Sequence, residues 1–113
     1  MSNRLNRNRM NKIWKNIVTE TQEEVKATFS EVYASLDFGA YIAPQDYFVS
    51  YIFETEETLN KAKEIGLLQK ISNYHKQLLR KKEYPEEGIK DCTFASQEDC
   101  DKEYNGNWYY YYK

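Results

Sequence analysis

The chain has 113 residues, a net charge of -2, and a composition in which 16% of residues are aromatic and 30% are charged. This length fits one domain with a single core, and the aromatic content argues against a disordered chain. The charge excludes a protein that holds nucleic acid by bulk positive charge, and no apolar run reaches the roughly 18 to 20 residues that cross a bilayer. We therefore expect a soluble, single-domain, cytoplasmic protein without a signal peptide.

The chain opens with a basic segment that carries no acid. Residues 1–9 alternate asparagine with arginine and include Arg4, Arg7 and Arg9. No core uses such a pattern, so we predict a flexible basic arm over residues 1–9 and a single α+β domain over residues 10–113. Met10 directly precedes the first patterned residues, which suggests that translation could also begin there.

The segment from Met10 to about Lys26 has the pattern of an amphipathic helix. Its apolar residues recur at three- and four-residue steps, and its acids fall largely on the other face. The stripe consists of Ile13, Trp14, Ile17, Val18, Thr21 and Val25. We expect this stripe to cover the sheet.

Two segments with a two-residue period predict neighbouring strands. Residues 32–38 alternate apolar with polar side chains, as a half-buried strand does. Residues 47–53 are mostly apolar on both alternating faces, which predicts the central strand of the sheet. Turn residues within 39–46 predict a hairpin with a long loop, and we expect Tyr41 and Ile42 to pack back onto the sheet edge.

A second helical segment follows the central strand. Thr55 is a good N-cap, with two glutamates in the first turn. The apolar residues of 59–78 advance by threes more often than one straight helix allows, so we expect a break or kink at Gly66. Basic residues crowd the last turns, and Pro85 closes the segment.

The last part of the chain predicts a strand, a brief helix and a terminal strand. Residues 93–95 have strand composition, Ser96 is the next N-cap, and 105–107 supply the turn that ends the helix. The inward residues of that helix are expected to be Cys100 and Tyr104. Residues 108–112 are predicted to form a strand. The order α-β-β-α-β-α-β indicates an α+β fold, with helices packed against a mainly antiparallel sheet of about four strands.

Catalytic and metal-binding motifs are sparse. His75 is the only histidine, and no CxxC, HExxH, GxSxG or phosphate-binding glycine motif occurs. We expect no metal and no cofactor, because His75, Cys92 and Cys100 lack zinc-site spacing. The two cysteines are expected to be free thiols in a reducing compartment, although a pair this close in sequence could bridge in an oxidising one. A Cys–His pair assembled in space stays open.

Charge is distributed in blocks along the chain. Residues 1–15 and 59–83 are basic, whereas residues 16–58 and 84–113 are acidic. Blocks of like sign within a small domain can form opposed patches that steer a partner. The alternative is that neighbouring blocks neutralise each other on folding.

The aromatic tail is the most unusual stretch of the sequence. In a strand, Trp108, Tyr110 and Tyr112 share one face and Tyr109 and Tyr111 the other, so one set could meet solvent unless both faces are covered. Tyrosine and tryptophan dominate binding hot spots because they bury large areas at little rotamer cost. The candidate partner-binding residues are Trp108, Tyr109, Tyr110, Tyr111, Glu98, Asp99, Asp101 and Glu103.

These features favour a small non-catalytic protein-binding module. We expect an immunity or inhibitor type of protein whose partner is a basic bacterial toxin or nuclease, because acids can capture a basic surface and rings can anchor it. The likeness to such proteins is one of size and style, and the Asn, Lys, Ile and Tyr usage hints at a bacterial source. Oligomeric state is left open.

Two alternative functions remain. A nucleic-acid-binding module would combine basic residues with stacking tyrosines, although the tyrosines fall in an acidic block. Its candidate residues are Arg4, Arg7, Arg9, Lys76, Arg80, Lys81 and Lys82. The third possibility is a small enzyme built on His75 with tyrosine, aspartate or cysteine partners.

Overall fold

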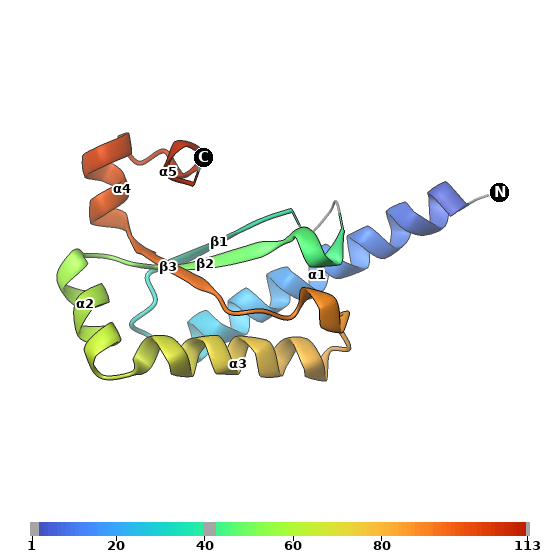
Figure 1. Cartoon of the computed structure of the whole chain (residues 1–113), viewed down its shortest axis with the longest axis horizontal. Coiled ribbons are helices and arrows are strands. Elements are labelled where there is room, and N and C mark those ends of the chain that lie inside the picture. The colour runs from blue at the N-terminus through green and yellow to red at the C-terminus, as the bar shows by residue number, and fades with distance from the viewer. Residues whose placement is uncertain (1–2, 40–42, 113) are drawn as a thin grey trace.

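The computed structural model describes residues 3–39 and 43–112, with side chains from Arg9 onward. Over these residues the chain forms five α-helices, three strands and two short 3-10 turns in one α+β unit (Figure 1). The helices are α1 (Asn3–Thr28), α2 (Glu56–Glu64), α3 (Leu67–Lys81), α4 (Gln97–Tyr104) and α5 (Trp108–Tyr111). The strands are β1 (Ala34–Phe38), β2 (Phe48–Phe53) and β3 (Thr93–Ser96), and the 3-10 turns are η1 (Pro44–Asp46) and η2 (Glu86–Gly88).

The sheet has the order β1-β2-β3, so the strand predicted to be central does lie in the middle. β1 and β2 form the expected antiparallel hairpin, with Ala34 opposite Ile52 and Phe38 opposite Phe48. β2 and β3 are parallel, with Tyr51 opposite Phe94. The mixed sheet corrects the expectation of a mainly antiparallel one.

The parallel pair follows from the helices that lie between β2 and β3 in sequence. Parallel neighbours need a crossover connection of a dozen or more residues, and α2 and α3 supply it. The break between these helices falls at Gly66, as predicted, where φ is +78°. Thr55 caps α2 as expected, because its hydroxyl accepts a hydrogen bond from the Thr58 N–H at 3.1 Å.

The predicted fourth strand is wrong, because residues 108–111 form the short helix α5. Asn105 and Gly106 both have positive φ, which ends α4 and turns the chain, and the Asn107 side chain then accepts from the Tyr110 N–H at 3.3 Å. A helical turn also brings Trp108 within 5.0 Å of Tyr111 and 6.0 Å of Tyr112, measured between ring centroids. Capping and ring contacts together outweigh the strand preference of aromatic residues.

Helices α1 and α3 cover one face of the sheet (Figure 1). The main core lies between these two helices and the sheet. Val18 and Val25 of α1, Tyr51 of β2, and Ile71 and Leu79 of α3 are fully buried there. The expected amphipathic helix is therefore present, although α1 begins at Asn3 rather than at Met10. The flexibility of residues 1–9 stays a prediction, since residues 1–2 and the side chains of Arg4 and Arg7 lie outside the described part.

The other face of the sheet is covered by α4 and α5. The β1 alternation predicted from the sequence turns its apolar side chains this way: Phe38 stacks on Phe48, and Tyr112 packs across both rings. The polar Asp37 instead faces α1, where it contacts Lys15 and accepts from Gln22 Nε2 at 2.7 Å. All five residues of β1 are half-buried, and Ala34, Leu36 and Phe38 make this edge strand apolar on the side away from the main core.

Two further expectations concerned the inward residues of α4 and the positions of Tyr41 and Ile42. Cys100 is buried as predicted, but Tyr104 is 41% exposed, so its expected inward position is wrong. Tyr41 and Ile42 lie outside the described residues. None of the described helices is long and apolar enough to span a membrane.

Candidate functional site

Helices α2 and α4 begin side by side because the parallel strands β2 and β3 end at the same edge of the sheet. Ser96, the predicted cap of α4, accepts from the Asp99 N–H at 3.0 Å. The two helix starts are also joined to each other: the Glu98 N–H donates to the Glu54 carbonyl at 3.1 Å, and Glu98 Oε1 accepts from the Glu56 N–H at 2.8 Å. Carboxylates are stabilised there by the positive ends of both helix dipoles.

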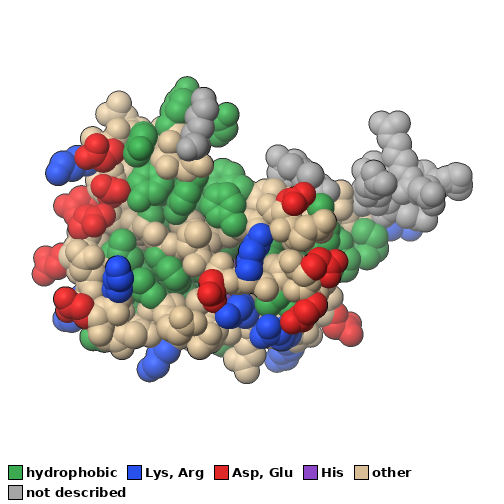
Figure 2. Space-filling view, in the orientation of Figure 1, with side chains coloured by type: hydrophobic (Ala, Val, Ile, Leu, Met, Phe, Trp, Pro, Cys, Tyr) green, Lys and Arg blue, Asp and Glu red, His purple; other side chains and the backbone are tan. Residues whose placement is uncertain are grey.

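This arrangement gathers acids from two distant parts of the sequence into one surface, which we call the acidic end. Its members are Glu54, Glu56, Glu57, Glu98, Asp99, Asp101 and Glu103, all exposed except the half-buried Asp99. Within the described residues no ion pair includes any of them. Figure 2 shows acidic side chains gathered over the region of α2 and α4. The acidic end therefore keeps a net negative field.

The aromatic tail divides differently from the predicted alternation. Trp108, Tyr111 and Tyr112 are half-buried: Trp108 stacks on Tyr112, and Tyr111 meets both rings edge-on. In contrast, Tyr109 is 65% and Tyr110 54% exposed. The Tyr112 hydroxyl also bonds to the hydroxyl of Ser50 on β2, which fastens α5 to the sheet. Figure 2 shows a continuous apolar area over α5 and the adjacent sheet, with acidic side chains beside it.

Asp99 and Tyr111 are brought into direct contact, which links the acids to the rings. Burial, a hydrogen bond with Asp99 and the charge of that carboxylate raise the pKa of Tyr111 to about 12. Tyr104 adds an edge-on contact to Tyr111 at 5.5 Å between ring centroids. Asp101 accepts from Gln97 Nε2 at 2.9 Å, and Glu103 lies exposed on the same helix.

Sequence reasoning missed part of this surface. Glu56 and Glu57 fit only the role of solvated helix caps when the chain is read linearly, and Glu54 carries no signal at all. Their contribution depends on β3 running parallel to β2, since an antiparallel β3 would carry α4 to the opposite edge. The parallel pairing is the feature that could have identified them.

Three basic residues on or just after α3 are engaged by acids from other blocks. Lys76 pairs with Asp91 at 2.8 Å, Arg80 with Glu86 at 3.3 Å, and Lys82 with Glu24 at 3.0 Å. Charge blocks thus neutralise each other around α3, whereas the acidic end stays unneutralised. Lys81 is exposed on α3 and Arg9 is exposed on α1, and nucleic-acid binding by these residues stays a prediction.

His75 lies inside the main core and is only 1% exposed. Its Nδ1 is 2.9 Å from the Tyr51 hydroxyl, and its Nε2 is 3.3 Å from the Tyr47 hydroxyl. In a neutral ring one nitrogen accepts and the other donates, so both tyrosines are satisfied. Burial, with a smaller contribution from the charge of Lys76, lowers the pKa of His75 to about 4. The geometry offers a substrate no access to this imidazole.

Both cysteines are free in the structure. Burial raises the pKa of the Cys92 thiol to about 12 and also raises that of Cys100. A raised pKa leaves little thiolate at neutral pH, so neither side chain is activated as a nucleophile. Among the residues that the structure describes, no cluster of three or more histidine, cysteine or acidic side chains is arranged to hold a metal ion.

No family model, no curated protein and no solved structure matches this chain.

Proposed function

We propose that this chain is a non-catalytic protein-binding module of the immunity or inhibitor type, and that it receives a basic protein surface on the acidic end and α5. The observation that carries the proposal is the absence of ion pairs among the described acids of the acidic end, beside two tyrosines that are more than half exposed. Unneutralised carboxylates steer a basic partner, and exposed rings anchor it.

The contrast with the rest of the surface supports this choice. Around α3, Lys76, Arg80 and Lys82 pair with acids from other blocks, which weakens the field there. Helix α4 carries four acids and one base, and its cap region joins the start of α2. Like charges held together raise the free energy of the folded domain, and a basic partner would relieve that repulsion.

A bacterial toxin or nuclease is the kind of partner that fits. A nuclease binds phosphates through clustered lysine and arginine, and such a cluster is complementary to the acidic end. A module that blocks the enzyme in the producing cell would act in the cytoplasm. The localisation and the partner class are both parts of the proposal.

The ring contribution is tested with the purified chain and a basic toxin-like protein encoded beside its gene. We expect calorimetry to show a complex that Tyr110→Ala weakens about tenfold or more, as hot-spot residues do. The matched control is Tyr33→Ala. Tyr33 is 56% exposed, close to the value for Tyr110, and it directly precedes β1, outside the acidic end and α5. Equal weakening by both variants, or no binding to any neighbouring gene product, would contradict the proposal.

The charge contribution is tested by kinetics. Glu103→Lys should slow association with the same partner severalfold and reduce its dependence on salt, because Glu103 belongs to the acidic end. Glu87→Lys is the control, since Glu87 is an exposed acid on η2, outside the acidic end. If the two reversals slowed association equally, overall charge rather than this surface would be responsible.

A further inference from the structure

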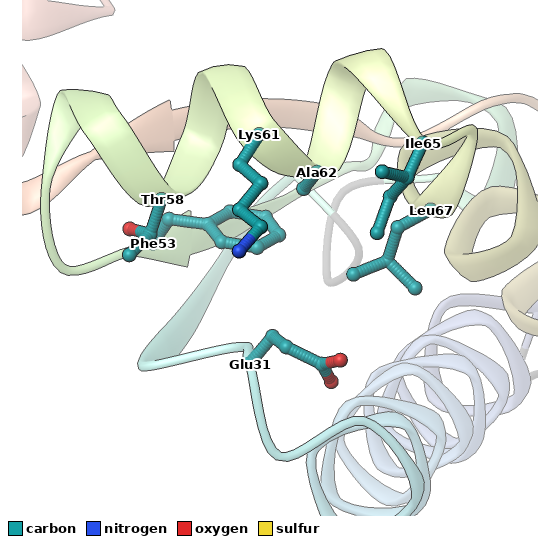
Figure 3. A pocket seen from close by; sticks show the side chains of 7 residues that line it. All are labelled: Glu31, Phe53, Thr58, Lys61, Ala62, Ile65 and Leu67. Atoms are coloured by element: carbon teal, nitrogen blue, oxygen red, sulfur yellow. The ribbon is translucent and has the colours of Figure 1, made fainter.

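A pocket lies between α2, the turn after α1 and the start of α3, and it has a volume of about 280 Å³ (Figure 3). Its floor consists of Phe53, Ala62 and Leu67, which are at most 8% exposed. It exists because the chain breaks at Gly66, where α2 ends and α3 sets off in a new direction, and because Ala62 is small. Neither the acidic end nor α5 contributes to its lining.

The rim of the pocket combines an apolar side chain with two opposite charges. Ile65 is 65% exposed, unusual for isoleucine, and it borders the apolar floor. Figure 3 shows Lys61 reaching into the opening from α2 and Glu31 rising from the opposite wall. Within the described residues no ion pair joins these two side chains to each other or to any other group.

The volume and the lining together restrict the ligand. The volume of about 280 Å³ lies just below the range for small-molecule sites, which is about 300 to 1,000 Å³, so a nucleotide-sized ligand would not be enclosed. An apolar side chain from a protein partner could fill the floor, but it would cover Lys61 and Glu31 without pairing them. A small molecule that carries both charges and an apolar group meets all three requirements.

We propose that this pocket binds a free aliphatic α-amino acid. The ligand carboxylate pairs with the Lys61 ammonium, the ligand ammonium pairs with the Glu31 carboxylate, and the aliphatic side chain covers Phe53 and Leu67 beside Ile65. The two ion pairs are partly open to water, so each adds modest affinity and the two together set selectivity. This site is independent of the protein-binding surface proposed above.

The ligand class is tested by titrating the full chain with L-leucine and recording amide NMR spectra. We expect saturable shifts confined to residues that line the pocket. Isocaproate lacks the ammonium group and isoamylamine lacks the carboxylate, so each should bind about fivefold more weakly than leucine. Glycine keeps both charges but has no side chain for the floor, so it should produce no saturable shift at the same concentrations.

Two exposed positions on the rim allow variants that leave the floor intact. Lys61→Gln should weaken leucine about fivefold while leaving isoamylamine unchanged, and Glu31→Gln should weaken leucine while leaving isocaproate unchanged. The controls are Lys63→Gln and Glu64→Gln, which remove exposed charges of α2 that do not line the pocket. Both controls should bind leucine like the unaltered chain.

Three results would overturn the inference. The first is a leucine titration without saturable shifts, and the second is equal binding of glycine and leucine. The third is equal binding of leucine, isocaproate and isoamylamine, which would identify a pocket for an apolar group alone, such as a partner's side chain. None of these results bears on the acidic end, so the two proposals fail separately.

Discussion

The face of the sheet under α1 and α3 and the face under α4 and α5 differ in how fully they are buried. The first contains Val18, Val25, Ile71 and Leu79 at no exposure, with Tyr51 of β2 between them. The second buries Ser50 and Ile52 of β2 fully but leaves Leu36, Phe38 and Phe48 half-buried beside a helix of four residues. The first face is packed as a core throughout, whereas the second keeps part of its apolar and aromatic surface exposed to solvent. Our proposal therefore places recognition on the second side of the sheet.

The largest expected change in stability comes from a substitution on the well-packed face. Leu79→Ala should lower the free energy of unfolding by about 2 to 5 kcal/mol, because it leaves a cavity that the buried neighbours cannot fill. Leu36→Ala on the other face should cost less than about 1.5 kcal/mol, since Leu36 already meets solvent. Urea unfolding of both variants measures the difference. Equal losses would show that the two faces contribute equally to stability.

The next prediction concerns the buried imidazole on the same well-packed face. His75 has a folded-state pKa of about 4 against an ordinary value of 6.5, so between these values the unfolded chain binds a proton that the folded chain does not. Stability should fall as pH drops from about 6.5 to 4, by about 3 kcal/mol in total. Unfolding of the native chain and of His75→Gln across this range isolates the contribution. A native chain that lost no more stability than the variant would refute the prediction.

A smaller change in stability is expected within the aromatic tail, where a half-buried and an exposed tyrosine can be compared. Tyr112→Phe removes the hydroxyl that bonds to Ser50 and should lower the free energy of unfolding by about 1 kcal/mol. Tyr110→Phe changes an exposed ring and should stay within about 0.5 kcal/mol of the unaltered chain. Thermal and urea unfolding measure both. If Tyr110→Phe cost more, the tail would be held in a different arrangement.

The smallest expected change in stability concerns the ion pairs that join the two helices of the well-packed face. Lys82, the residue that follows α3, pairs with Glu20 and Glu24 of α1, and these carboxylates raise its pKa. Lys82→Gln should cost well under about 1 kcal/mol at low salt, because exposed ion pairs contribute little. The cost should disappear in about 1 M salt, where such pairs are screened. A loss that persisted at high salt would mean that Lys82 acts through packing of its alkyl chain.

The sequence by itself predicted most local features correctly. The central strand, the hairpin, the break at Gly66 and the caps at Thr55 and Ser96 each depend on residues close together in the chain. Hydrophobic period, helix capping and the freedom of glycine act over a few residues, so they can be recognised without knowing what lies nearby in space. The α+β class followed from the same signals.

The tertiary structure decided the remaining features. The direction of β3, the turning of β1 so that Asp37 faces α1, and the helical form of α5 all depend on contacts between residues far apart in sequence. Residues 108–111 coil and the Tyr112 ring packs against Phe38 and Phe48. No local preference of a tyrosine run indicates this arrangement. The acidic end follows from the parallel β3, because only that direction places the starts of α2 and α4 together. Sequence composition determined which side chains were available, and long-range packing determined which of them share a surface.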